Sequence, residues 1–139
     1  MIAQKSGASD AVVVLGGHFD SVPGLSGAND NASGISVLLA IAELLADVDL
    51  SYTSRIVSFD SEELGLFGNR VYVQGLSSTE LENTRLMANF DALSTGSGVA
   101  IFGDGVFTDL INEKDSEVGV DVRVSRRNRG GTSDFAVFR

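Results

Sequence analysis

Short runs of β-branched residues alternate with stretches of helical apolar spacing along this chain, and this alternation limits its possible folds most strongly. The run at 11–16, Ala-Val-Val-Val-Leu-Gly, is continuous and apolar, which is typical of a buried strand. Residues 32–46 then place apolar side chains at helical spacing, and Asn31 or Ser33 can cap the start of that helix. A second buried strand is expected at 55–59.

The rest of the chain continues the same alternation. Gly, Ser, Asn and Asp crowd residues 16–34, which predicts a long loop of the kind that often carries function. The further expected elements are a helix at 66–76, a helical turn at 77–83, strands at 85–90 and 98–102, a helix at 106–114 and a strand at 118–124. This order, β-α-β-α-β-β-α-β, predicts an α/β fold in which helices are layered on a sheet.

Composition excludes several classes of protein. The 139 residues fit one domain, and the net charge of −9 has the wrong sign for nucleic-acid binding. The absence of cysteine excludes a disulfide scaffold, a thiolate zinc site and a cysteine nucleophile. The longest apolar run, 35–42, is too short to span a bilayer. The N-terminus lacks an apolar core of signal-peptide length, so the signal of an exported parent would have been removed or would lie outside this sequence. The absence of cysteine does not fix a compartment.

Four polar clusters fall where predicted strands end or the first helix begins. They are His18 with Asp20, Asp30, the pair 62–63 (Glu-Glu), and Asp91. Sites in open α/β sheets gather at the carboxyl ends of strands, so we expect these side chains to meet. Each cluster alone has a structural explanation, such as a turn, a helix cap or a solvated face. The argument for a functional site therefore rests on their combination.

These residue types indicate a metal centre. His18 and Asp20 are two residues apart, so their side chains project the same way from an extended strand end, and the carboxylate can fix the imidazole tautomer. One imidazole and three carboxylates, from His18, Asp30, Glu63 and Asp91, suit zinc, manganese or cobalt. Adjacent Glu62 and Glu63 tend to point apart, which permits one to bind metal and the other to move protons.

Two other interpretations of the loop before the first helix fail. Asn29, Asn31, Ser33 and Gly34 match the first positions of a calcium-binding EF-hand loop, but the position that requires a bidentate Glu is Ala40. The sequence 31–33, Asn-Ala-Ser, is also a glycosylation sequon, but a sequon within a catalytic loop would be inaccessible.

The segments 17–22, 27–34, 59–68 and 89–91 together resemble the co-catalytic di-zinc aminopeptidases of metallopeptidase family twenty-eight. The resemblance covers 11–93, with a weaker match at 131–135. It implies a mixed, mostly parallel sheet with helices on both faces, the zinc-exopeptidase (phosphorylase/hydrolase-like) fold. It also implies two zinc ions and a cis peptide after the bridging Asp. The resemblance implies that His18 and Asp91 bind one zinc ion, that Glu63 binds the other, and that Asp30 bridges the two. It also implies that Asp20 orients His18 and that Glu62 is the general base.

The chain also departs from that family. The family's last zinc ligand is a His downstream of the Ser-Asp segment, whereas His18 is the chain's single histidine. Family catalytic domains are also longer, so residues 1–139 are expected to be one partial peptidase catalytic domain with an incomplete fold. We therefore expect one zinc ion or none, little activity from this chain, and self-association through a sheet edge exposed near 118–124 and 135–138.

Three alternative functions stay open at this stage. An aminoacylase or carboxypeptidase type of metallohydrolase carries a similar Gly-His-x-Asp motif, but its bridging Asp lies further along the chain than Asp30 does here. The same fold supports glutaminyl cyclisation with one zinc ion. It also serves as a non-catalytic binding module, although such a module has no need for Glu62.

Overall fold

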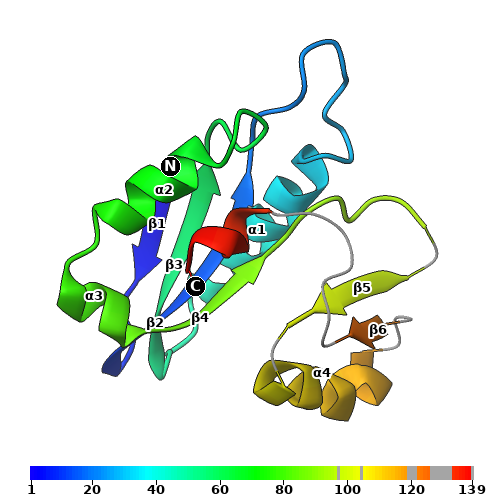
Figure 1. The fold of residues 1–139 in the computed structure, drawn as a ribbon. Helices are drawn as coiled ribbons and strands as arrows, with labels where there is room; N and C mark the ends of the chain where they lie inside the picture. Colours follow the sequence, from blue (N-terminus) through cyan, green and yellow to red (C-terminus); the bar gives the residue numbers. More distant parts are fainter. Residues whose placement is uncertain (97, 104, 119–121, 126–132, 139) are drawn as a thin grey trace. The chain divides into compact units, whose positions relative to one another are not determined.

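The computed structural model describes residues 1–96, 98–103, 105–118, 122–125 and 133–138 (Figure 1). The chain divides into two compact units: one contains Met1–Ser94 and Thr132–Arg139, and the other contains Thr95–Gly131. Assignment of all 139 residues to one partial catalytic domain stays a prediction.

The first unit is built on a four-stranded sheet. Its strands are β1 (Ile2–Lys5), β2 (Ser9–His18), β3 (Tyr52–Phe59) and β4 (Thr84–Asn89), in the order β1-β3-β2-β4. β2 runs parallel to both β3 and β4, whereas β1 is antiparallel to β3. The sheet is therefore mixed and mostly parallel, which confirms the predicted fold class.

Helices cover both faces of this sheet (Figure 1). α1 (Ala32–Leu45) packs on one face, where a Cβ added to Gly17 would meet Leu38 at 3.4 Å. On the other face lie α2 (Phe67–Gln74), α3 (Ser78–Asn83) and the 3₁₀ helix η1 (Asp134–Phe138). The core there is apolar and consists of Val12, Val14, Val57 and Phe59, with Tyr72, Met87 and Phe138 packed against it. This packing holds the strand ends that carry the polar clusters.

The second unit is small. β5 (Val99–Phe102) pairs in parallel with β6 (Val122–Ser125), and α4 (Gly105–Val118) connects them. Thr108 on α4 is buried within this unit.

The structure corrects three expectations. The sequence analysis did not predict β1, whose four residues are mostly exposed and carry no buried apolar run. The predicted start of the last strand is wrong, because Val118 still belongs to α4 and β6 begins at Val122, while 119–121 lie outside the described residues. Residues 135–138 do not form an exposed sheet edge: they are half-buried in η1, where the Phe138 ring centroid lies 5.9 Å from that of Tyr72.

In the described part of the chain, no helix is long and apolar enough to cross a membrane.

Candidate metal centre

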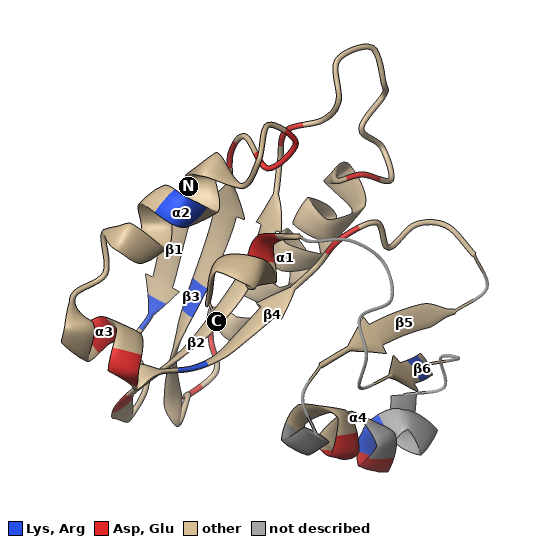
Figure 2. Ribbon diagram, viewed as in Figure 1, with Lys and Arg blue, Asp and Glu red and all other residues tan. Residues whose placement is uncertain are grey.

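The parallel strands of the first unit bring the predicted site residues together at the carboxyl ends of the strands. His18 is the last residue of β2, Asp91 follows β4, and the Glu62–Glu63 pair follows β3. Asp30 lies in the loop that leads into α1. Acidic residues accordingly lie in the loops that follow β2 and β3 (Figure 2). The expected convergence is therefore observed, because the carboxyl ends of parallel strands lie at the same edge.

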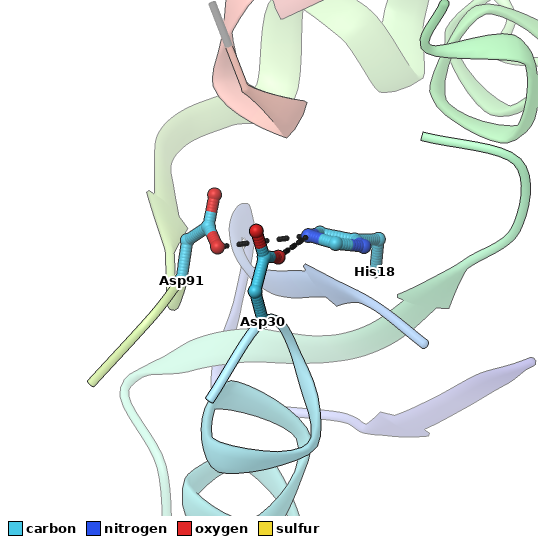
Figure 3. A group of neighbouring side chains, drawn as sticks. All are labelled: His18, Asp30 and Asp91. Carbon is cyan, nitrogen blue, oxygen red and sulfur yellow. Dashed lines mark ion pairs between the residues drawn. The ribbon is translucent and has the colours of Figure 1, made fainter. Parts of the chain in front are cut away.

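His18 lies at the centre of this cluster (Figure 3). Its side chain is 1 % exposed, and its Nε2 atom lies 3.1 Å from Asp30 Oδ1 and 3.6 Å from Asp91 Oδ1. The carboxylate of Asp30 is 56 % exposed, so the cluster opens toward solvent on that side. One ligand atom from each of these three residues lies within 4.8 Å of the others, which is compact enough for a shared cation.

Asp20 holds two parts of the site at once. Its backbone oxygen lies 3.1 Å from His18 Nδ1, and its carboxylate Oδ1 lies 3.5 Å from the same atom. The two carboxylate oxygens accept the backbone N–H groups of Glu62 at 3.0 Å and of Glu63 at 3.1 Å. Donation of Nδ1–H to the Asp20 backbone oxygen leaves Nε2 facing Asp30 and Asp91, where a bound metal would replace its proton.

Glu62 and Glu63 approach the imidazole from the other side. One ligand atom of each glutamate and one of His18 lie within 4.8 Å of one another. No such cluster among the described residues joins Glu63 to Asp30, although the family resemblance implied that Asp30 bridges to the zinc ion of Glu63. The two clusters share His18 and lie on either side of it.

The C-terminal helix η1 adds two residues that the sequence analysis did not assign to the site. The hydroxyl of Ser133, just before η1, donates to Asp91 Oδ2 at 2.6 Å and lies 2.8 Å from the amide of Asn89. Asp134 is fully buried beside them, and its Oδ1 atom has no hydrogen-bond partner among the residues that the structure describes. The weak match of 131–135 to the family was the one signal in the sequence that pointed here.

The pKa values of several site residues are shifted from their usual values. Burial lowers the pKa of His18, but the hydrogen bond to Asp91 and the charges of Asp134, Asp91 and Glu62 outweigh it and raise that pKa to about 9. Burial also raises the pKa of Glu62 to about 7 and that of Asp134 to about 6. The hydrogen bond from His18 lowers the pKa of Asp91. The surrounding carboxylates thus favour positive charge at the imidazole, where a cation would bind.

These donors fit a divalent metal such as zinc. Neutral imidazole and carboxylate oxygens are its ordinary protein ligands, and the tautomer needed for binding through Nε2 is already favoured by the Asp20 carbonyl. The Asp30–Asn31 peptide bond is cis, as the family resemblance implied.

Comparisons with known proteins agree with this geometry. The model of Peptidase family M28 matches residues 1–139. The probable leucine aminopeptidase 2 of Aspergillus oryzae is 40% identical over 106 residues, which are 76% of this chain and 21% of that protein. The chain thus spans about a fifth of the length of this curated relative.

Solved structures share the fold. BSAP, a zinc aminopeptidase from Bacillus subtilis, matches with a TM-score of 0.84 and 30% identity, over 99% of this chain and 36% of its own. A glutaminyl cyclase from an Acidobacteriales bacterium matches with a TM-score of 0.83 over 99% of this chain and 53% of its own. Its 21% identity shows a common fold and does not distinguish between the two reactions.

Proposed function

Because this chain belongs to peptidase family M28, we propose that the whole protein is a zinc-dependent aminopeptidase, which hydrolyses the N-terminal residue from peptides. The observation that carries the proposal is the double cluster around His18. Asp30 and Asp91 lie near its Nε2 atom, while Glu62 and Glu63 form the second group. A binding module would need the first group but has no need for Glu62, a proton acceptor in the second.

Each residue has a proposed role. His18, Asp30 and Asp91 would hold one zinc ion, and Asp30 and Glu63 would hold a second. Zinc in such a site supplies Lewis-acid activation of the water and of the peptide carbonyl. Asp20 orients His18 through its backbone oxygen and fixes the Glu62–Glu63 backbone through its carboxylate.

Glu62 is the proposed general base. Its carboxylate takes a proton from the attacking water and delivers it to the departing amine as the peptide bond breaks. Glu62 suits this role because it is only partly buried and lies within reach of the cluster around His18. The acidic surroundings also favour a substrate that presents a free, positively charged α-amine (Figure 2).

We also propose that the chain associates with a second copy through the free edge of β4. Among the described residues β4 pairs with β2 alone, and an unpaired edge strand is a template for pairing with another chain. A groove of about 310 Å³ is lined by residues of β4 together with Leu81 of α3 and Phe138 of η1.

The activity is tested with the whole protein. Zinc content by elemental analysis and release of a chromogenic amine from a leucyl substrate are measured for the unsubstituted protein and for His18→Ala. We expect zinc and hydrolysis in the first and loss of both in the second. Zinc binding without hydrolysis of any aminoacyl amide would contradict the proposal and favour a binding module. Cyclisation of N-terminal glutamine without such hydrolysis would favour the glutaminyl cyclase alternative.

A further inference from the structure

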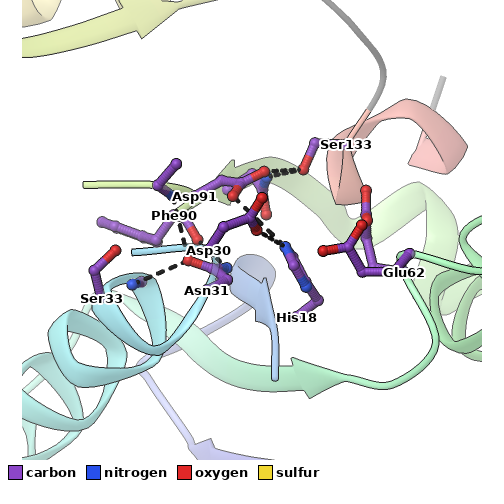
Figure 4. Close-up of polar contacts among 12 residues, drawn as sticks. His18, Asp30, Asn31, Ser33, Glu62, Phe90, Asp91 and Ser133 are labelled. Carbon is purple, nitrogen blue, oxygen red and sulfur yellow. Dashed lines mark hydrogen bonds and ion pairs between the residues drawn. The ribbon is translucent and has the colours of Figure 1, made fainter. Parts of the chain in front are cut away.

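Alternate residues of the loop before α1 hold the chain segment that follows β4. Asn29, Asn31 and Ser33, which we call the polar triplet, all bind this segment through side-chain atoms. Figure 4 shows Asn31 beside Phe90. The contacts are Asn31 Nδ2 to Phe90 O at 2.9 Å, Ala92 N to Asn31 Oδ1 at 3.3 Å, Leu93 N to Ser33 Oγ at 2.9 Å, and Ser94 N to Asn29 Oδ1 at 2.9 Å. Three consecutive backbone N–H groups are therefore bound by three alternate side chains.

The polar triplet brackets the two aspartates that face His18. Asp30 lies between the first two members of the triplet, and Asp91 lies between two of the backbone groups that the triplet binds. These hydrogen bonds join positions 59 to 65 residues apart in the sequence. The separation between the two carboxylates is consequently fixed by side-chain contacts to backbone, and not by the sheet alone.

The two segments are also packed too closely for ordinary side chains. A Cβ atom at Gly34 would lie 2.2 Å from Phe90 O, and one at Gly17 would lie 2.8 Å from the same oxygen. Asn31, at the centre, is 1 % exposed and uses both amide atoms. Ala92 adopts a left-handed φ of 52°, which L residues rarely do, and Asn31 binds its N–H group.

Capping of α1 does not explain this arrangement. The cap requires the contact of Gly34 N with Asn31 Oδ1, at 3.1 Å, and nothing from the other two members of the triplet. Asn29 nevertheless binds both the N–H and the hydroxyl of Ser94, and Ser33 binds Leu93 N while it donates to Asn29 O.

We propose that the polar triplet is a positioning device, which sets the separation of Asp30 and Asp91 and thereby the affinity of the site for its first zinc ion. The inference rests on the proposed function, because it assigns these residues to the same metal centre. Groups that orient metal ligands in this way commonly contribute about 10- to 100-fold to metal affinity.

The test compares substitutions of the two triplet members that do not cap α1. Ser33→Ala removes the acceptor for Leu93 N, whereas Ser33→Thr keeps a hydroxyl there. Asn29→Ala removes the acceptor for Ser94. Ser36→Ala is the matched control, since its hydroxyl bonds within α1, to Ala32 O. The zinc affinity of the whole protein and of each variant is measured by calorimetric titration with zinc chloride. Amide hydrogen exchange of Leu93 and Ser94 is measured in the metal-free form.

We expect Ser33→Ala and Asn29→Ala to lose about tenfold or more in zinc affinity, and Ser33→Thr and Ser36→Ala to retain it. Leu93 should lose exchange protection in Ser33→Ala, and Ser94 should lose it in Asn29→Ala. Unchanged zinc affinity in both Ala variants would overturn this inference and leave the proposed function intact. Lack of exchange protection at Leu93 and Ser94 in the unsubstituted protein would do the same. If the unsubstituted whole protein bound no zinc while these amides stayed protected, the proposed metal centre itself would fail.

Discussion

At the scale of single residues, the site depends on side chains that bind backbone as much as on those that would bind metal. Asp20 illustrates this, because its two carboxylate oxygens accept two consecutive N–H groups, those of Glu62 and Glu63. A carboxylate is acceptor-only, so it can serve both donors, whereas an amide offers one acceptor oxygen. The orientation of the candidate base is therefore coupled to the residue that also supports His18.

Replacement of Asp20 tests this coupling. In Asp20→Asn, the backbone N–H of either Glu62 or Glu63 would face the side-chain NH₂ group instead of an acceptor. The Glu62–Glu63 turn should therefore shift, while the backbone oxygen of residue 20 still faces His18. We expect turnover of leucyl substrates by the whole protein to fall about 10- to 100-fold, with a smaller change in zinc content. Asp10→Asn, at an exposed position, is the control. Unchanged turnover in Asp20→Asn would refute the coupling.

Substitutions of Glu62 and of Glu63 should affect turnover and zinc content differently. Glu62→Gln removes a proton acceptor and should lower turnover about 10²- to 10⁴-fold with nearly unchanged zinc content. Glu63→Gln should lower zinc occupancy first and activity as a consequence. Elemental analysis and steady-state kinetics on the same preparations of the whole protein measure both quantities. Equal zinc loss in the two variants would refute the division of roles.

At the scale of secondary-structure elements, one surface glutamate ties α3 to the sheet. The Glu80 carboxylate completes a capping box with Ser77, and its other oxygen accepts from Arg55 of β3 at 3.0 Å. The hydrogen bonds from Ser77, together with the Arg55 charge, lower the pKa of Glu80 from 4.5 to about 2. Because the folded-state pKa is the lower one, the ionised carboxylate stabilises the fold above about pH 4.5, and this contribution is lost as the pH falls toward 2.

Glu80→Gln isolates the charge, since Gln can keep a capping contact with Ser77. We expect the urea midpoint of Glu80→Gln to be below that of the unsubstituted chain at pH 7, and the two midpoints to converge between pH 4.5 and 2. Glu82→Gln, at an exposed position of the same helix, is the control. A difference between the midpoints that persisted unchanged at pH 2 would show that the carboxylate charge is not its source.

The elements also show what the sequence could and could not predict. α1 and β2 were predictable because helical apolar spacing and a β-branched run are strong local signals. β1 was missed because it has four mostly exposed residues, and its place is set by pairing with β3, far along the chain. The position of Ser133 against Asp91 was likewise unpredictable from local pattern, because tertiary packing of η1 brings the two together.

At the scale of the whole molecule, the first unit has β1 and β4 as its outer strands. β1 is short, whereas β4 is longer and lines the groove to which Leu81 contributes. The site residues come from the ends of β2, β3 and β4 and from the loop before α1, all within this unit. Burial of the β4 edge against another chain would thus leave the described metal centre in place.

Analytical ultracentrifugation tests the proposed association. We expect the weight-average sedimentation coefficient to rise with concentration, because the β4 edge and its groove can pair with a second copy. Leu81→Lys should weaken this rise by placing a charge in the groove, whereas Leu39→Lys, at an exposed position of α1, should not. A monomer at all concentrations, or equal effects of the two variants, would contradict association through this surface.

We propose that His18, Asp30 and Asp91 share a zinc ion, and anomalous diffraction at the zinc absorption edge from crystals grown with zinc would locate that ion. We predict an anomalous peak about 2.0–2.2 Å from His18 Nε2 and from a carboxylate oxygen of each aspartate. A peak bound at His18 Nδ1, a peak near His18 that omits Asp91, or no peak at this edge of the sheet would contradict the account.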